Sequence, residues 1–511
     1  MLAEDGRKWF RQWAMESLSW NLVTQHGGER STIAPGARRA LMHDYKHDFK
    51  SENLSHDPVH GYIPFTSSAL LADGEVSERQ VIDHPWLQRL RQIHQLQTAW
   101  WVYPTAEHTR FQHVLGAMHL GSRVAAHTYE SLASVCPDVP SRGYIESLVR
   151  MAGLLHDVGH GPFGHFFDEH FLKGFGLTHE TLGSVIIREH LGPMLRGLRK
   201  NPSSQLAENE SLDPDHIAWL IVRPKGDDGA EKPTWLRFLR ALLSGIYTID
   251  NMDFVLRDAF MSGYSPRAFD LDRLLHYTFF SPQGLTIHDR GIEALVRFLS
   301  VKAELFRVIY FHRTVRAIDQ ALADLFRESK DLLFPGNPLE HLDDYQQFTE
   351  SSLLVDTARW AKSNDPRIRS LGLRWRDLQA RNIPWVTVCQ RNLVFSAGES
   401  EQSSIFTDPK MVESKIREML PADLREVPLR VDIARAIMRP HTLGPAAGQN
   451  FLYDSAADQL KPLSANVLYK RLPHSHRLCR IYAPSTEHSV LITAAVDSLL
   501  GGSSTDDVTN M

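Results

Sequence analysis

Apolar residues recur at helical spacing along most of this chain. In residues 85–97, Leu87, Leu90, Ile93 and Leu96 alternate with arginine and glutamine, which predicts an amphipathic helix. The same pattern predicts helices over residues 109–132, 147–155, 236–260 and 291–326. Strand signals are few and short, at residues 61–65, 284–287, 385–388 and 480–483. The balance indicates a mainly α protein.

Shifts in composition divide the chain into four parts. Residues 1–50 are polar with charges of both signs, and we expect an N-terminal extension without a core of its own. Residues 51–335 carry the strongest helical patterns and end at a turn cluster, residues 334–338. Short strands then interleave with helices such as residues 409–420, so residues 336–500 are expected to form a C-terminal helical and α+β lobe. Residues 501–511, rich in small polar residues, are predicted to be a disordered tail.

Charge and cysteine content indicate an intracellular protein. The net charge of −5 argues against broad nucleic-acid binding, although residues 196–200 form a local basic patch, so nucleic acid as a partner stays open. Three widely spaced cysteines fit reduced thiols better than a disulfide framework. Residues 1–8 lack the pattern of a signal peptide, and no stretch is apolar enough to cross a membrane. We therefore expect a cytoplasmic protein with no membrane partner.

Histidine is the unusual component, and its densest cluster follows an apolar stretch. Residues 156–168 contain three of the 26 histidines together with Asp157 and Asp168. Burying polar groups without partners costs free energy. We therefore expect these side chains, at the end of a buried helix face, to bind something or to take part in chemistry. Histidine and aspartate bind divalent metals and exchange protons near neutral pH. Residues 156–168 therefore suggest a metal-dependent hydrolase.

A metal at His156 and Asp157 requires a break in the helix and further ligands. Adjacent helical residues point about 100° apart, and the glycines that follow supply the break. His113 and Asp250 are the candidates for the remaining ligands. Each also fits an ordinary role, His113 as a satisfied histidine and Asp250 as a helix cap. Two histidines and two carboxylates suit a divalent metal such as Mn, Mg, Fe, Co, Ni or Zn.

The order His113, His156-Asp157, Asp250 is similar to the H…HD…D signature of the HD-domain phosphohydrolase superfamily. More narrowly, the chain resembles the animal dNTP triphosphohydrolases that pair a sterile-alpha-motif with an HD domain, and their bacterial relatives. The resemblance covers residues 55–330 clearly and extends faintly to about residue 500, and we expect no sterile-alpha-motif segment before it. It rests on Asp57-Pro58-Val59-His60-Gly61, Gln88-Arg89-Leu90-Arg91, Arg110-Phe111-Gln112-His113, residues 156–163 and Thr178-His179-Glu180.

The resemblance implies a mainly α fold, with a large helical HD-domain core over residues 51–335 and a smaller C-terminal α+β lobe, in a homo-oligomer. It also implies a reaction, in which a deoxynucleotide substrate is hydrolysed to deoxynucleoside and intact inorganic triphosphate. The implied metal ligands are His113, His156, Asp157 and Asp250. His165 would protonate the departing 5′ oxygen with Asp168 orienting it, while His160 and His179 would lie beside the phosphates or support the site.

The same resemblance implies how the substrate is bound. The implied contacts are Arg110 and Lys302 with phosphates, Gln95 and Asp258 with the sugar 3′ hydroxyl, and Leu96 and Tyr310 against a 2′ hydroxyl. Three departures affect this set. Asn251 and Phe254 stand where the animal enzymes have a lysine and a tyrosine that reach the outer phosphates, and Lys302 replaces an arginine. A weaker grip on the β and γ phosphates leaves a mono- or diphosphate substrate open.

A regulatory nucleotide is a further prediction. Asp83, Gln88 and Arg91 match positions that bind an activating guanine nucleotide in the animal enzymes, whereas His56 replaces an asparagine of the neighbouring pocket. An aspartate and an arginine can read the edge of guanine, but surface helices also carry such residues by chance.

Three functions stay open at this point. The leading one is metal-dependent dNTP hydrolysis, with a role in nucleotide balance or antiviral defence. The second keeps the metal site but cleaves another nucleotide, such as a monophosphate, a cyclic dinucleotide or an RNA end. The third is a nucleotide-sensing or nucleic-acid-binding protein with a vestigial site. Retention of all four candidate ligands argues against the third.

Overall fold

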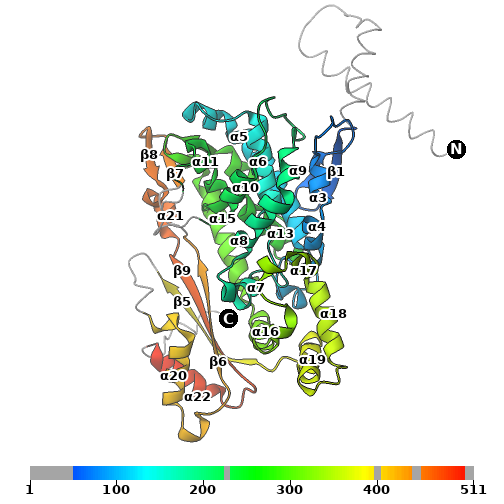
Figure 1. The fold of residues 1–511 in the computed structure, drawn as a ribbon. Coiled ribbons are helices and arrows are strands. Elements are labelled where there is room, and N and C mark those ends of the chain that lie inside the picture. The colour runs from blue at the N-terminus through cyan, green and yellow to red at the C-terminus, as the bar shows by residue number, and fades with distance from the viewer. Residues whose placement is uncertain (1–49, 224–228, 230, 396–403, 440–449, 501–511) are drawn as a thin grey trace, which may run out of the picture. The chain divides into compact units, whose positions relative to one another are not determined.

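A computed structural model describes residues 50–223, 229, 231–395, 404–439 and 450–500. The chain divides into one unit of residues Met1–Ser51 and a second of residues Glu52–Met511. Residues 1–49 of the predicted extension and the predicted tail, residues 501–511, lie outside the described residues. The second unit is mainly helical, with a large helical core and a smaller sheet-containing C-terminal region (Figure 1), which confirms the predicted fold class.

Three helices frame the part of the core that carries the histidine cluster: α5 (Arg110–Val135), α6 (Arg142–Leu155) and α13 (Ile249–Met261). Each has an N-terminal cap encoded in the sequence: Thr109 forms a capping box, and the side chains of Ser141 and Thr248 accept backbone N–H groups of the first turn. Helix α6 is buried along almost its whole length, because it packs against α5. The predicted helices over residues 109–132 and 147–155 are thus confirmed.

Three predicted helices are interrupted. Residues 85–97 form only α4 (Pro85–Gln88) and a 3-10 turn (Arg89–Gln92), because Ile93 is extended and its carbonyl accepts the N–H of Arg110. Residues 236–260 are divided between α11 (Thr234–Leu239), α12 (Ala241–Ser244) and α13, with Gly245 outside helical geometry. Residues 291–326 are divided between α15 (Ile292–Leu305), a π turn (Phe306–Tyr310) and α16 (Arg313–Leu333). Apolar periodicity predicted the helices but not their breaks.

Most of the other helices are shorter. In the core they are α3 (Glu78–Ile82), α7 (His165–His170), α8 (His179–Val185), α9 (Gly192–Arg196), α10 (Pro214–Ile221), α14 (Leu271–His276), α17 (Leu342–Gln347), α18 (Glu350–Trp360) and α19 (Pro366–Gln379). Toward the C-terminus they are α20 (Pro409–Met419), α21 (Val467–Arg471) and α22 (Ser489–Leu499).

The strands form three sheets. An antiparallel hairpin joins β1 (Glu52–Asp57) to β2 (Gly61–Thr66). A four-stranded sheet has the order β3 (Thr278–Ser281), β4 (Gly284–His288), β7 (Asn450–Asp454) and β8 (Gln459–Pro462), with β4 and β7 parallel. The third sheet has the order β5 (Val386–Phe395), β9 (Ser475–Ala483) and β6 (Arg430–Ile437). The four predicted strands fall in β2, β4, β5 and β9, whereas β1, β3, β6, β7 and β8 were not predicted.

The C-terminal sheet has its own apolar core and is fixed to the helical core by ion pairs. Helices α20 and α22 pack against the β5–β9–β6 sheet (Figure 1), around buried residues such as Val412, Ile481 and Val496. From the helical core, Arg316 on α16 reaches Asp432 on β6 with Nε–Oδ2 and Nη2–Oδ1 distances of 3.0 and 2.5 Å. Asp432 is buried, so this pair holds β6 against α16.

Candidate metal and acid–base site

The four predicted metal ligands come from three helix ends that meet. His113 lies in the first turn of α5, and Asp250 lies in the first turn of α13. Helix α6 ends at Leu155, so that His156 is its C-cap and Asp157 begins the following turn. The helix end that was predicted at His156 is therefore present, and it lets two adjacent residues point to one place.

The ligand atoms converge. The Nε2 atoms of His113 and His156 are 3.2 Å apart, and Oδ1 of Asp250 lies 3.2 Å from the first and 3.6 Å from the second. Oδ1 of Asp157 lies 3.3 Å from Nε2 of His156, beside the three ligand atoms of His113, His156 and Asp250 that all lie within 4.8 Å of one another. The rings of His113 and His156 meet edge to face. We call these four residues the Nε2 cluster.

The hydrogen bonds on the far side of each ring show that a cation fits here. Nδ1 of His113 donates to Oδ2 of Asp253 at 2.7 Å, and Nδ1 of His156 donates to the carbonyl of Gly153 at 2.9 Å. Because each Nδ1 carries a hydrogen, each neutral ring presents the lone pair of Nε2 to the other ring and to the carboxylates. Two facing lone pairs and two carboxylates repel one another unless a cation lies between them, and this donor set suits a divalent metal.

The pKa shifts of the Nε2 cluster also indicate that positive charge is favoured at this site. Burial disfavours the charged form of His113, yet Asp250 and Asp253 raise its pKa to about 10. Burial also opposes ionisation of Asp157 and Asp250, but the neighbouring histidines, and for Asp157 also Arg110, hold both carboxyl pKa values well below their usual range. Without a metal, protons on the imidazoles would neutralise these carboxylates.

A second group of histidines surrounds one carboxylate, and we call His160, His165, His179 and Asp168 the Asp168 cluster. Oδ2 of Asp168 accepts from Nδ1 of His179 at 2.6 Å and from Nδ1 of His165 at 3.2 Å. The rings of His160 and His179 are stacked, with centroids 3.7 Å apart. The four predicted catalytic residues thus lie together, with His165 the most exposed of them.

His160 lies between the two clusters. It is fully buried, its Nε2 is 3.4 Å from Oδ1 of Asp157, and its Nδ1 is 3.6 Å from Oδ1 of Asp168. Among the described residues neither of its ring nitrogens has a hydrogen-bond partner at normal distance. Its position fits the predicted alternative in which it supports the site, because it is less accessible than His165.

The pKa of His165 is lowered, not raised. Desolvation in the cavity wall disfavours the charged ring, and His160 and Arg110 add to this effect, so that together they outweigh Asp168. An anionic phosphate beside His165 would act in the opposite direction and favour the protonated ring. A role as proton donor therefore depends on the substrate being bound.

Both clusters open on one cavity of about 520 Å³. Among the predicted substrate contacts, Gln95, Arg110 and Lys302 line this cavity. Arg110 donates from Nη1 to Oδ2 of Asp157 at 2.6 Å. Its guanidinium has room because Gly164 has no side chain, since a Cβ there would lie 2.1 Å from Nη2. The φ of Gly164 is also +55°, which favours glycine.

Lys302 stands in for an expected phosphate-binding arginine, but its ammonium contacts Asn251, another residue that differs from the family pattern. Its Nζ donates to Oδ1 of Asn251 at 2.8 Å and lies 5.5 Å from the centre of the Phe254 ring. Burial lowers the pKa of Lys302 to about 8, with Asp250 acting in the opposite direction. The cavity also contains Arg223, which pairs with Glu180 at 2.9 Å.

An adjoining cavity of about 280 Å³ gathers the residues that were predicted to contact the sugar. It shares Gln95, Arg110 and His165 with the first cavity. Its further lining includes Leu96, Asp258 and Tyr310. The hydroxyl of Tyr310 donates to Oδ2 of Asp258 at 2.5 Å, and Nε2 of His108 lies 2.8 Å from Oδ1 of the same residue.

The predicted regulatory residues lie near one another, apart from both cavities. Nε of Arg91 donates to Oε1 of Gln88 at 2.7 Å, and Asp83 pairs with Arg79 at 3.3 Å. The Arg91 guanidinium lies 3.7 Å from the centre of the Phe111 ring. These contacts are ordinary for a helical surface, so nucleotide regulation stays a prediction.

Four buried residues next to the clusters were not predicted as site residues: His60, His108, Asp253 and Arg257. His60 belongs to the Asp57–Gly61 motif, and Asp253 and Arg257 lie one and two turns after Asp250 on α13. The regular spacing of Asp250, Asp253 and Arg257 on one helix was the available signal, but it is equally typical of a solvated helix face.

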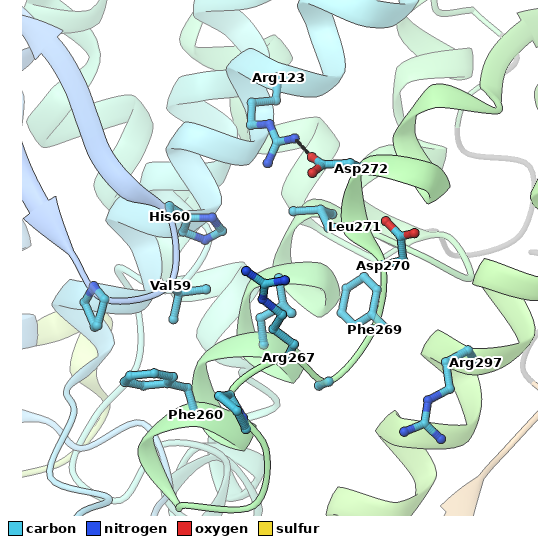
Figure 2. Close-up of a pocket in the computed structure, with 14 residues that line it drawn as sticks. Val59, His60, Arg123, Phe260, Arg267, Phe269, Asp270, Leu271, Asp272 and Arg297 are labelled. Atoms are coloured by element: carbon cyan, nitrogen blue, oxygen red, sulfur yellow. Dashed lines mark hydrogen bonds and ion pairs between the residues drawn. The ribbon is translucent and has the colours of Figure 1, made fainter.

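A larger cavity, of about 900 Å³, contains none of the predicted metal or catalytic residues (Figure 2). Val59 and His60 lie on one of its walls, and Arg123, Arg267 and Arg297 on others. Arg123 is paired with Asp272. Its size alone does not make it the reaction site, because the convergent ligand atoms lie elsewhere.

Comparison with known proteins agrees with this geometry. Residues 110–221, which contain His113, His156, Asp157 and the whole Asp168 cluster, match the family model of the HD domain. The chain has an HD domain. HD domains bind divalent metals and belong to a phosphohydrolase superfamily, so the match supports a hydrolase.

Named relatives support a narrower resemblance. The human and bovine deoxynucleoside triphosphate triphosphohydrolases SAMHD1 are 25% and 24% identical to the chain, over 94% and 86% of its length and 77% and 76% of theirs. An uncharacterized Bacillus subtilis protein, YwfO, is 26% identical over 64% of the chain and 71% of its own length. The HD-domain chain therefore resembles SAMHD1 and its bacterial relatives.

A solved structure shows the same fold. A hypothetical protein from Aquifex aeolicus superimposes with a TM-score of 0.62 at 20% identity, over 87% of the HD-domain chain and 100% of that protein. Within the described residues, no helix is both long and apolar enough to span a membrane.

Proposed function

We propose that this HD-domain protein hydrolyses deoxynucleoside triphosphates to deoxynucleoside and inorganic triphosphate, with a divalent metal at His113, His156, Asp157 and Asp250. The observation that carries the proposal is the convergence of His113, His156 and Asp250, with Asp157 beside them, on a cavity that the Asp168 cluster also borders. A divalent cation held there would supply Lewis-acid polarisation of the phosphoryl group and offset its charge. The similarity to SAMHD1 supports the choice of substrate.

The side chains that line the cavities would bind the phosphates, donate a proton and recognise the sugar. Arg110 and Lys302 bind and orient the phosphates through charge-assisted hydrogen bonds. Water attacks the α-phosphorus and releases a proton to the solvent, and the bond from that phosphorus to the 5′ oxygen breaks. His165 gives a proton to the departing oxygen while Asp168 holds the opposite ring nitrogen. His179 shares Asp168 and lines the same cavity, which supports a role beside the phosphates. Gln95 and Asp258 bind the 3′ hydroxyl, and Leu96 and Tyr310 leave little room for a 2′ hydroxyl.

One observation favours a second candidate substrate. The cavity wall contains Asn251 and Phe254, where the family pattern implies a lysine and a tyrosine, and Lys302 is engaged with Asn251. The grip that the family pattern implies on the outer phosphates is therefore altered, although Arg223 also lies in the cavity wall. A nucleotide with a shorter phosphate chain, or another phosphoester such as a cyclic dinucleotide or an RNA end, would need fewer contacts to outer phosphates.

Product analysis separates the candidates. Purified protein with Mn²⁺ or Mg²⁺ would be incubated with each dNTP and with dNDPs and dNMPs, and the products separated by ion-exchange chromatography. Intact triphosphate supports the proposal, whereas pyrophosphate or orthophosphate supports the second candidate. Asp250→Ala should lose activity, while Asp215→Ala, at an exposed ion pair, should not. Full activity in Asp250→Ala would overturn the proposed site.

Three further properties belong to this proposal: assembly as a homo-oligomer, activation by a nucleotide at Asp83, Gln88 and Arg91, and a cytoplasmic location. Sedimentation with and without added nucleotides would test the first two. Arg91→Ala should abolish stimulation by guanine nucleotides without loss of metal. Kinetics that do not respond to any added nucleotide would rule out the activation.

A further inference from the structure

The Asp57–Gly61 motif has no role in the proposed reaction, although it touches the site. It forms the turn between β1 and β2. Oδ1 of Asp57 accepts the backbone N–H groups of Val59 and His60, both at 2.9 Å, and fixes the shape of the turn. The turn thereby presents two side chains, Asp57 and His60, to helix α13.

Both side chains form hydrogen bonds with the same part of α13. Nε2 of His60 donates to Oδ1 of Asp253 at 2.6 Å, and Oδ2 of Asp57 accepts from Nη1 of Arg257 at 2.7 Å. Arg257 in turn donates from Nε and Nη2 to the two oxygens of Asp253, each at 2.9 Å. The side chains of His60, Asp253 and Arg257 are 1%, 0% and 1% exposed, so water does not compete for these bonds.

The last bond of this network reaches a metal ligand. Oδ2 of Asp253 accepts the Nδ1 hydrogen of His113 at 2.7 Å. This bond decides that Nε2 of His113, and not Nδ1, has the free lone pair, and it fixes the plane of the ring. The position of Asp253 therefore sets the position of the Nε2 donor.

The sequence leaves space for this carboxylate. Gly116 lies one turn after His113 on α5, and a Cβ at that position would be 1.9 Å from Oδ1 of Asp253 and 2.4 Å from Nη2 of Arg257. Any side chain at residue 116 would displace Asp253 from His113. Helix α5 thus supplies both the ligand and the space for its support.

We propose that His60 is a positioning residue for the metal site, acting through Asp253 on His113, so that the β1–β2 turn belongs to the metal-binding framework. This inference rests on the proposed function. His60 also lies on the wall of the 900 Å³ cavity (Figure 2), so one carboxylate separates that cavity from a metal ligand. The role is one of orientation, and His60 does not contact the substrate.

Metal affinity tests the inference without reference to turnover. Mn²⁺ binding to the full chain would be measured by calorimetry and by electron paramagnetic resonance. Loss of a hydrogen bond that supports a metal-binding histidine weakens affinity by about 10- to 100-fold. We expect about 10-fold weaker binding for His60→Ala, partial recovery for His60→Gln, whose amide can donate to Asp253, and a loss of similar or larger size for Gly116→Ala.

A neighbouring histidine provides the matched control. The His119 ring lies 5.4 Å from that of His60, and among the described residues its Nδ1 has no hydrogen-bond partner. His119→Gln should bind Mn²⁺ like the wild type. Circular dichroism and thermal unfolding without metal would identify variants that fail to fold, and His60→Gln then remains as the milder probe.

The outcomes distinguish a failure of the positioning role of His60 from a failure of the proposed metal site. If wild type binds Mn²⁺ and Asp250→Ala does not, yet His60→Ala and Gly116→Ala fold and bind with wild-type affinity, the positioning role is overturned while the metal site stands. If Asp250→Ala also binds with wild-type affinity, the proposed site itself is wrong. A drop in kcat of His60→Ala at saturating Mn²⁺ with unchanged Mn²⁺ affinity would also contradict the inference.

Discussion

The two histidine–carboxylate clusters have similar composition but opposite geometry. In the Nε2 cluster the Nδ1 atoms of His113 and His156 are bonded outside the cluster, and the Nε2 atoms converge on the carboxylates. In the Asp168 cluster the Nδ1 atoms of His165 and His179 converge on Asp168. In the Nε2 cluster the lone pairs of the rings face inward, whereas in the Asp168 cluster the N–H groups of His165 and His179 point inward to the carboxylate. We therefore propose that the inward nitrogen distinguishes a cation site from a proton-transfer site.

The largest effect should come from a carboxylate of the Nε2 cluster. Asp157→Asn keeps the size of the side chain but removes the charge that faces His156 and Arg110, so we expect loss of metal binding and a fall in turnover of about 10³-fold or more. Metal content of the dialysed protein and turnover should fall together. Asp331→Asn, which removes an exposed carboxylate paired with Arg367, should change neither. Retained metal with lost turnover would assign Asp157 to another role.

A smaller and different effect is expected from the Asp168 cluster. Asp168→Asn removes the acceptor of His165 and His179, and general acid catalysis contributes about 10² to 10⁴ in rate, so turnover should fall by about 10²-fold or more. Mn²⁺ affinity should stay within about 2-fold of wild type, because no Nε2-cluster hydrogen bond is lost. Loss of metal in Asp168→Asn would contradict the proposed difference between the clusters, since it would make this cluster a cation site as well.

Much of the Nε2 cluster could be predicted from the sequence, because its residues follow visible features. His156-Asp157 stands at the end of an apolar helix, and the order with His113 and Asp250 resembles a known signature. The support behind it could not be predicted in the same way. His60 lies far from Asp253 in the sequence, and only the folding of the β1–β2 turn onto α13 brings the two to 2.6 Å.

The fold shows the same limit. Apolar periodicity identifies α5 and α6, since a buried stripe needs nothing beyond its own spacing. It fails over residues 85–97, where Ile93 leaves the helix because its carbonyl is bonded by Arg110 from a distant segment. It also misses β6, whose charged Asp432 is buried only because Arg316 pairs with it. Long-range partners, which periodicity cannot show, decided these elements.

A pH profile sharpens the role of the cation at the cavity. Burial lowers the pKa of Lys302 to about 8, so its ammonium is charged below that pH and is lost as pH rises through it. Phosphate binding should then weaken, and kcat/KM should fall by about 10-fold between about pH 7 and 9. Lys302→Arg should flatten this part of the profile, because arginine stays charged. The ratio of the two profiles removes pH effects that both enzymes share. A constant ratio would exclude Lys302 as a phosphate contact.

The smallest effect concerns a histidine–carboxylate pair outside both clusters, His94 and Glu350, whose Nδ1 and Oε1 are 2.8 Å apart. Burial disfavours the charged form of His94, but Glu350 and Glu107 outweigh it and raise its pKa. A raised pKa in the folded state stabilises the protein fully below the unfolded value of about 6.5, and the contribution is lost as pH rises through the folded value. His94→Gln should thus lower the free energy of unfolding by about 1 kcal/mol at pH 5.5, and by less at pH 8.5.

Denaturant titrations at the two pH values measure this difference, and the activity and metal content of His94→Gln should stay at wild-type levels. The expectation follows from geometry, because His94 contacts two carboxylates but lines neither reaction cavity. A larger stability loss at pH 8.5 than at pH 5.5 would reverse the sign and show that the ring is neutral in the folded protein. If His94→Gln lost its metal, a histidine–carboxylate pair outside the Nε2 cluster would be needed for metal binding. The convergence of Nε2 atoms would then not be a sufficient description of the metal site.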